Sequence, residues 1–183
     1  PHGSYKQVTD KEIAAISSHQ KIQAVGERTN IGYIGTGVFA KVPAEVSFMD
    51  KNCTQWSFAS PIEGHIPRSG KEITMDTNAL ALLGIEPKIG AEVPLTFTVG
   101  DQYQYAYEKT DTFTLVGWWE YDEAIVANHV LVPESRVNAV LEEVGVTPGQ
   151  AEDGMTGSWN MDVMLKSGAR RIGQDVDQIL ASH

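Results

Sequence analysis

The order of the predicted secondary-structure elements constrains this fold more than any single motif does. A helix is predicted near each end of the chain: residues 9–12 form a capping box before the first, and Ile172, Val176, Ile179 and Leu180 form an apolar stripe on the last. The stretches between them are dominated by alternating and β-branched residues, which predict strands. A β-rich middle flanked by helices favours an α+β fold over a doubly wound parallel sheet.

Periodicity and turn residues predict the inner elements. We expect a strand, a break and a second strand within residues 22–39, an irregular segment at residues 50–70, and strands at 41–49, 72–75, 92–99, 102–107, 112–119, 129–132 and 158–165. Asp76 or Thr77 caps a short helix at 78–83, which Gly84 ends. Pro133 begins another helix, with its apolar positions at i, i+3, i+4 and i+7 from Val137, and Gly145 ends it.

Composition bounds the size and the partners of the protein. A chain of 183 residues is long enough for one compact domain with a substantial core. Its 14 basic and 24 acidic residues give a net charge of −10. A chain this acidic repels phosphate backbones and anionic lipids, so we expect no nucleic-acid partner and no charge-driven membrane binding. No apolar stretch approaches the ~20 residues that span a bilayer.

The usual catalytic and metal-binding signatures do not occur. The single cysteine, Cys53, excludes an internal disulfide and a multi-cysteine zinc site, and its expected role is that of a small buried apolar residue. No two of the five histidines have metal-ligand spacing. Residues 35–40 match the loose dinucleotide pattern G-x-G-x-x-A, but a strand pattern containing Pro43 follows where a helix is needed. We therefore predict no catalytic residue, no metal ligand and no cofactor site.

One local feature suggests recognition. Trp118 and Trp119 are adjacent on a predicted strand, so their rings face opposite sides of the sheet, and we expect one of them at the surface or at an interface. They are candidate contact residues for a sugar or a peptide. This keeps two alternatives open: a free-standing secreted carbohydrate- or peptide-binding module, and a small enzyme whose site is assembled from distant residues.

A series of short motifs resembles a known family. Residues 61–75 contain E-G-x-x-P followed by E-I, residues 82–85 contain L-G, residues 88–93 contain G-x-x-V, and residues 113–117 end in V-G. In this order they resemble the extracytoplasmic domain of the FtsX/MacB-like ABC transporter permeases, of the Gram-positive type. The matching positions, to which we assign structural duties, are Glu63, Gly64, Pro67, Glu72, Ile73, Gly84, Gly90 and Gly117. His65 stands where the family usually has Arg, and Ala91 where Asp is common.

The resemblance implies a non-catalytic domain between two membrane helices of a permease, at the extracytoplasmic face of the cell membrane. A domain excised from such a place would begin without Met and carry no membrane span. The implied partners are the membrane helices of the same permease and a cytoplasmic ATPase. The domain would relay ATP-driven motion or recognise a peptide, lipid or lipoprotein. Residues 1–49 and 124–183 would form a mixed α/β subdomain, with residues 50–123 as an inserted β-rich subdomain.

Overall fold

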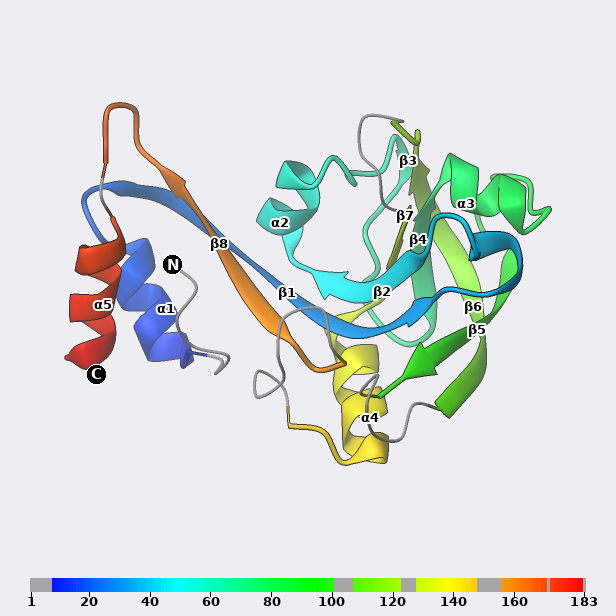
Figure 1. Cartoon of the computed structure of the whole chain (residues 1–183). Helices are drawn as coiled ribbons and strands as arrows, with labels where there is room; N and C mark the ends of the chain where they lie inside the picture. The colour runs from blue at the N-terminus through cyan, green and yellow to red at the C-terminus, as the bar shows by residue number, and fades with distance from the viewer. Residues whose placement is uncertain (1–7, 101–106, 123–127, 148–155, 171, 183) are drawn as a thin grey trace.

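The computed structural model describes residues 8–100, 107–122, 128–147, 156–170 and 172–182. Helices are interspersed among the strands along this part of the chain, with one α-helix near each end (Figure 1). The helices are α1 (Asp10–Ser17), the 3₁₀ turn η1 (Gly37–Phe39), α2 (Lys51–Trp56), α3 (Thr77–Leu82), α4 (Glu134–Val144) and α5 (Gly173–Ala181). The strands are β1 (Ile22–Ile34), β2 (Ala44–Met49), β3 (Glu63–Gly64), β4 (Glu72–Asp76), β5 (Glu92–Val99), β6 (Tyr107–Trp119), β7 (Asn128–Leu131) and β8 (Trp159–Leu165). The fold is α+β, as predicted.

The main sheet closes on itself. Its strands pair in the order β2-β7-β4-β6-β5-β1, and β1 pairs back with β2. The pairs β2–β7 and β4–β6 are parallel, and the other pairs in the ring are antiparallel. Strands β5 and β6 pair antiparallel from Glu92↔Thr114 to Val99↔Tyr107, and the parallel strand β4 lies at the other edge of β6. Residues 107–119 form one strand, so the expectation that the chain breaks between strands at 102–107 and 112–119 is wrong. Residues 102–106 of the expected strand lie outside the described residues.

The main core fills this closed sheet. Alternate residues of the strands are buried together, as in β5, where Val93, Leu95, Phe97 and Val99 face inward and their neighbours face outward. Helix α4 adds Val137, Val140 and Leu141, and η1 adds Phe39. Apolar side chains at every second position of a strand, and at every third or fourth position of a helix, thus form the buried faces that the sequence predicts.

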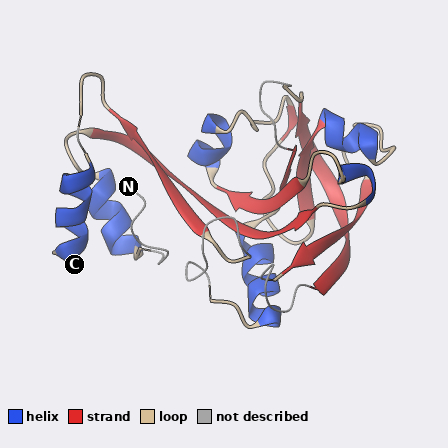
Figure 2. Ribbon diagram, in the orientation of Figure 1, coloured by secondary structure: helices blue, strands red, loops and turns tan. Residues whose placement is uncertain are grey.

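A second, smaller unit lies outside the closed sheet. The first half of β1 pairs with β8 from Ile22↔Leu165 to Thr29↔Trp159, and this two-stranded ribbon leads away from the main body to helices α1 and α5 (Figures 1 and 2). Ile16, Ile22 and Val176 form a separate cluster there. We call α1, α5 and the adjoining ends of the ribbon the helical end. Residues 8 and 182, the first and the last that the structure describes, both lie at the helical end.

Two further sequence-based expectations are wrong. Residues 22–34 form one continuous strand, with a bulge between Asn30 and Gly32, and the next element is η1 rather than a second strand. Gly26 does not break this strand: a Cβ there would lie 2.8 Å from the backbone N of Cys53, so the glycine allows α2 to approach. Residues 51–56 form α2 instead of an irregular segment, because the Asp50 carboxylate accepts a hydrogen bond from Cys53 N at 2.8 Å and caps the helix.

Other expectations are confirmed. Thr9 and Glu12 form the capping box of α1, and Asp76 caps α3 by accepting a hydrogen bond from Ala79 N at 2.6 Å. Gly84 ends α3 in the left-handed conformation. The last helix begins later than its apolar stripe suggests, at Gly173. Strands from residues 50–123 lie between strands from the rest of the chain in one sheet, and the division into two subdomains stays a prediction.

Candidate functional site

The motif residues gather along β6, and the closest approach is at Gly64. Glu63 pairs with Trp118 and Gly64 with Gly117. Ile62 N–H donates to the Trp118 carbonyl at 2.8 Å, and His65 N–H donates to the Val116 carbonyl at 3.0 Å. A Cβ on Gly64, whose φ is +77°, would lie 1.9 Å from the Val116 oxygen. The two backbones are therefore in direct contact, which leaves no room for a side chain at this position.

The next motif residues join β4 to the other side of β6. Ile73 is fully buried opposite Leu115. The Glu72 carboxylate accepts hydrogen bonds from the backbone N–H groups of Arg68 at 2.7 Å and Ser69 at 3.2 Å. The Arg68 bond, helped by the Ser69 bond, lowers the pKa of Glu72 against the opposing effect of burial. Glu72 thus closes the turn that leads into β4.

The remaining motif residues lie at turns. Gly90 N–H donates to the Leu115 carbonyl at 2.8 Å, and Gly84 follows α3. Pro67 is half-buried within the segment that crosses from β3 to β4. All these contacts are backbone pairings, turns or a carboxylate cap, and the assignment of these residues as family markers stays a prediction.

The adjacent tryptophans face opposite sides, as expected, but neither ring is exposed. Trp119 is 6% exposed and packs with Met49, Cys53 and Leu131, whereas Trp118 is half-buried against the main core. Trp119 is therefore covered within the fold, whereas part of Trp118 remains accessible. A contact role for the pair stays a prediction.

Sequence reasoning did not single out two exposed apolar side chains in the segment after α2. Phe58 is 73% exposed and Ile62 is 59% exposed. The available signal was the absence of any charged residue from residues 52–62, in a chain of net charge −10. That run is compatible with a buried segment as well as with an exposed one, so the sequence alone does not distinguish them.

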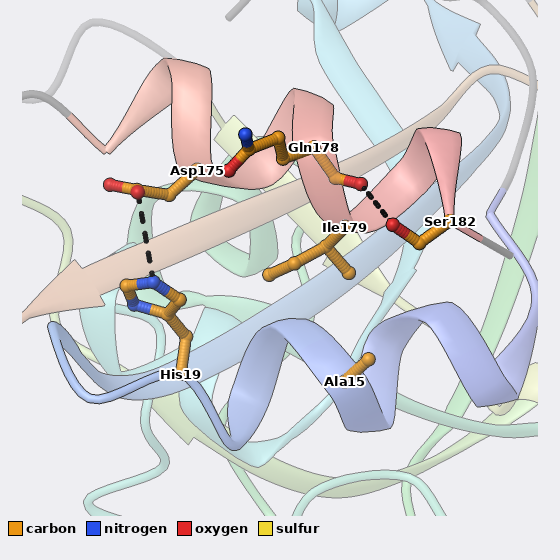
Figure 3. Close-up of a pocket in the computed structure, with 6 residues that line it drawn as sticks. All are labelled: Ala15, His19, Asp175, Gln178, Ile179 and Ser182. Atoms are coloured by element: carbon orange, nitrogen blue, oxygen red, sulfur yellow. Dashed lines mark hydrogen bonds and ion pairs between the residues drawn. The ribbon is translucent and has the colours of Figure 1, made fainter.

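A shallow depression of about 350 Å³ lies between α1 and α5 (Figure 3). His19 and Asp175 lie at one side of it, with His19 Nε2 3.9 Å from Asp175 Oδ1. Asp175 Oδ2 also accepts a hydrogen bond from Lys21 Nζ at 2.8 Å, and this bond lowers the pKa of the Asp175 carboxyl. The depression is thus bordered by an ion pair that joins α5 to the start of β1.

Ser182 lines the same depression, so the arrangement invites comparison with a hydrolase triad. In a triad the carboxylate binds Nδ1 of the histidine and the serine binds Nε2. Here Nδ1 of His19 accepts the N–H of Lys21 at 3.1 Å, and Nε2 faces Asp175. The Ser182 hydroxyl donates instead to the Gln178 carbonyl at 2.8 Å, across the depression from His19 (Figure 3). The three residues do not have the geometry of a triad.

Cys53 lies in a small core cluster with Met49, Ala59, Trp119 and Leu131. It is 1% exposed, and burial, together with the charge of Asp162, raises the pKa of its thiol to about 12. It is therefore a protonated apolar residue, as predicted. Within the described ranges, no three His, Cys, Asp or Glu side chains form a metal-binding group. The same ranges contain no helix long and apolar enough to cross a membrane.

Comparison with solved structures defines the fold as that of the extracytoplasmic domains of ABC transporters. The chain is similar to the periplasmic region of MacB from Actinobacillus actinomycetemcomitans, with a TM-score of 0.53 and 14% identity over 97% of this chain and 74% of that one. It is also similar to the extracellular domain of the noncanonic ABC-type transporter YknZ from Gram-positive bacteria, with a TM-score of 0.50 and 10% identity over 94% and 78% of the two chains. No family model and no curated protein matches. The fold implied by the motif order is thus confirmed.

Proposed function

We propose that this chain is the non-catalytic extracytoplasmic domain of an ABC transporter permease, located at the outer face of the cell membrane of a Gram-positive bacterium. It works with the membrane helices of the same permease and with a cytoplasmic ATPase. It relays ATP-driven motion and recognises a peptide, lipid or lipoprotein. The observation that carries this proposal is the fold shared with MacB and YknZ over nearly the whole chain.

The helical end supports the relay. It contains both outer ends of the described chain, and its cluster of Ile16, Ile22 and Val176 is separate from the main core. The Lys21–Asp175 ion pair joins α5 to β1, and Lys166 N–H donates to the Lys21 carbonyl at 2.9 Å. A movement applied to α1 and α5 therefore reaches the closed sheet through the paired strands β1 and β8.

Weakening the helical end tests the relay. In the full-length protein, reconstituted with its ATPase, Val176→Ala removes two methyl groups from the small cluster. We expect ATP turnover to continue while transport falls, because the small unit no longer moves as one body. Val137→Ala, which removes the same groups from the main core, is the matched control and should leave the ratio of transport to ATP turnover unchanged. Equal ratios for both variants would contradict the relay.

A labelling experiment tests the proposed location of the domain at the outer face of the membrane. A cysteine placed at the exposed Val38, in a Cys53→Ala background, should react with a membrane-impermeant maleimide in intact cells. Labelling only after lysis would overturn the assignment to the outer face.

A further inference from the structure

One edge of β1 loses its partner strand where the ribbon leaves the main body (Figure 1). From Arg28 to Ile34, β1 pairs with β2. For residues 22–27, β8 is the only partner strand in the described part of the chain, and it lies on the opposite edge. Backbone groups left free on a strand edge need other partners. Here these partners come from α2, which directly follows β2 in the chain.

Two residues at the start of α2 bind this free edge. Asp50 N–H donates to the Glu27 carbonyl at 3.0 Å, and Glu27 N–H donates to Asp50 Oδ2 at 2.9 Å. Asn52 Nδ2 donates to the Val25 carbonyl at 2.7 Å. We call Asp50 and Asn52 the clamp. The start of α2 thus takes the place of a neighbouring strand beside residues 25–27.

Gly26 allows the clamp to close. A Cβ at this position would lie 2.8 Å from Cys53 N and 3.1 Å from the ring of Trp56. Gly26 lies within β1 and is not among the glycines with positive φ, so its conformation is open to other residues. The missing side chain therefore serves the close approach of α2, and not a turn.

Helix α3 begins with the same sequence pattern, Asp-x-Asn, and makes the same kind of contact. Asp76 Oδ2 accepts a hydrogen bond from His129 N–H at 3.3 Å, and Asn78 Nδ2 donates to Asn128 Oδ1 at 3.1 Å. Both bonds reach β7, a strand of the closed sheet. The clamp of α2 instead reaches the part of β1 that has left this sheet. It therefore joins the ribbon to the main body.

The contacts of the clamp reach both strands of the ribbon. The main chain of Glu27 is bound by Asp50, and its carboxylate accepts a hydrogen bond from Trp159 Nε1 of β8 at 3.2 Å. Helix α2 is itself held on the main body by Cys53, which packs with Met49 and other buried residues. A two-stranded ribbon has little stability of its own, so a contact at its base limits how far it bends.

We propose that the clamp fixes the direction in which the ribbon leaves the main body, so that the helical end is held in one orientation. Asp50 and Asn52 are then positioning residues. The purpose of the clamp rests on the proposed function, because a movement of α1 and α5 reaches the closed sheet in full only if the base of the ribbon does not bend.

The first test measures this orientation in the 183-residue chain. Val38→Cys in η1 and Asp177→Cys in α5 place spin labels at exposed positions of the two units, and double electron–electron resonance gives the distribution of distances between them. Cys53 stays in place because its thiol is buried. We expect one narrow distribution. Asn52→Asp, which cannot donate to the Val25 carbonyl, should make it about twice as broad.

Asn78→Asp is the matched control, because it makes the same change at the same position of α3. It should leave the width unchanged. A carboxylate in the first turn of a helix stabilises the helix, so broadening by Asn52→Asp is not explained by unfolding of α2.

A second variant opens the clamp by steric means. Gly26→Ala should displace α2 from β1 and broaden the distribution in the same way. Gly35→Ala is its control, because the nearest atoms to its new Cβ belong to the Tyr33 side chain, at 3.4 Å. Far-UV circular dichroism checks that each variant is folded. A broad distribution without any clamp substitution, or an unchanged one in both Asn52→Asp and Gly26→Ala, would overturn the proposal.

Failure of the clamp and failure of the relay give different results. In the full-length protein with its ATPase, Asn52→Asp should lower the ratio of transport to ATP turnover, and Asn78→Asp should not. A broadened distance distribution with an unchanged ratio would support the clamp and contradict the relay. An unchanged distribution would contradict the clamp, whatever the ratio.

Discussion

The contact between Gly64 and β6 predicts a large loss of stability on adding one carbon atom. In Gly64→Ala the new Cβ would lie 1.9 Å from the carbonyl oxygen and 2.8 Å from the carbonyl carbon of Val116, so the two backbones must separate. Separation breaks the Ile62–Trp118 and His65–Val116 hydrogen bonds, at about 1 kcal/mol each. A left-handed alanine adds about 1 kcal/mol. We expect a total of about 3 kcal/mol, or a thermal midpoint roughly 6–12 °C lower.

Two glycines provide matched controls for this experiment. Gly84 has a similar φ of +70°, but no atom lies within 4 Å of the point that a Cβ would occupy, so Gly84→Ala should cost about 1 kcal/mol, the conformational part alone. Gly117 has no left-handed φ, but its Cβ would lie 2.8 Å from the His65 oxygen, so Gly117→Ala isolates the steric part. Circular dichroism during urea and thermal denaturation measures all three. A Gly64→Ala variant no less stable than Gly84→Ala would refute the reasoning.

Two further predictions follow from buried ionisable groups. With its thiol pKa raised to about 12, Cys53 should react with Ellman's reagent at pH 8 roughly 1,000-fold more slowly in the native chain than in denaturant; equal rates would mean that it is accessible. Burial alone would raise the pKa of Asp111, but the hydrogen bond from Lys71 (2.6 Å) and the charge of Arg136 outweigh this and lower it from 3.8. Its contribution to stability is therefore present above pH 3.8 and lost as the pH falls through the lower, folded-state pKa. Asp111→Asn should lower the free energy of unfolding by about 2 kcal/mol at pH 7. It should also reduce the loss of stability on acidification, and an unchanged loss would contradict this.

The predictable parts of the fold are those with local signals. Asp76 and Gly84 mark the two ends of α3, and Gly145 marks the end of α4, because caps and left-handed residues are determined by nearby backbone groups. The alternation in β5 predicts both the strand and its buried face. The motif order extends this to the fold of a whole domain, which neither composition nor periodicity specifies.

The unpredicted parts depend on distant contacts. Gly26 and Gly32 suggest breaks in β1, yet each allows another segment to approach: a Cβ on Gly26 would meet Cys53 N, and one on Gly32 would lie 2.3 Å from the Thr98 oxygen. Helix α2 is short, includes β-branched and aromatic residues, and ends at Phe58 instead of glycine, so propensity does not reveal it. Closure of the sheet by the β1–β2 pairing has no local signature.

The candidate site also has some features that the sequence predicts and others that depend on distant contacts. The motif positions around Gly64 follow from a resemblance in sequence, and the structure adds which strand they contact. Exposure of Phe58 and burial of Trp119 were not predictable, because each depends on whether another element covers the ring. In this chain, the fact that a residue is aromatic does not by itself predict whether its side chain is exposed or buried.

Strand β1 belongs to both units: its first half pairs with β8 and its second half with β2. Because side chains alternate along a strand, inserting or deleting one residue within β1 between Gly26 and Thr29 would rotate the preceding half by half a turn. Ile22 would then point away from α1 and α5, and these helices would dock on the opposite side of the ribbon. The side of the ribbon on which the two helices dock thus depends on whether the number of residues in this part of β1 is odd or even, unless a bulge such as the one between Asn30 and Gly32 absorbs the change.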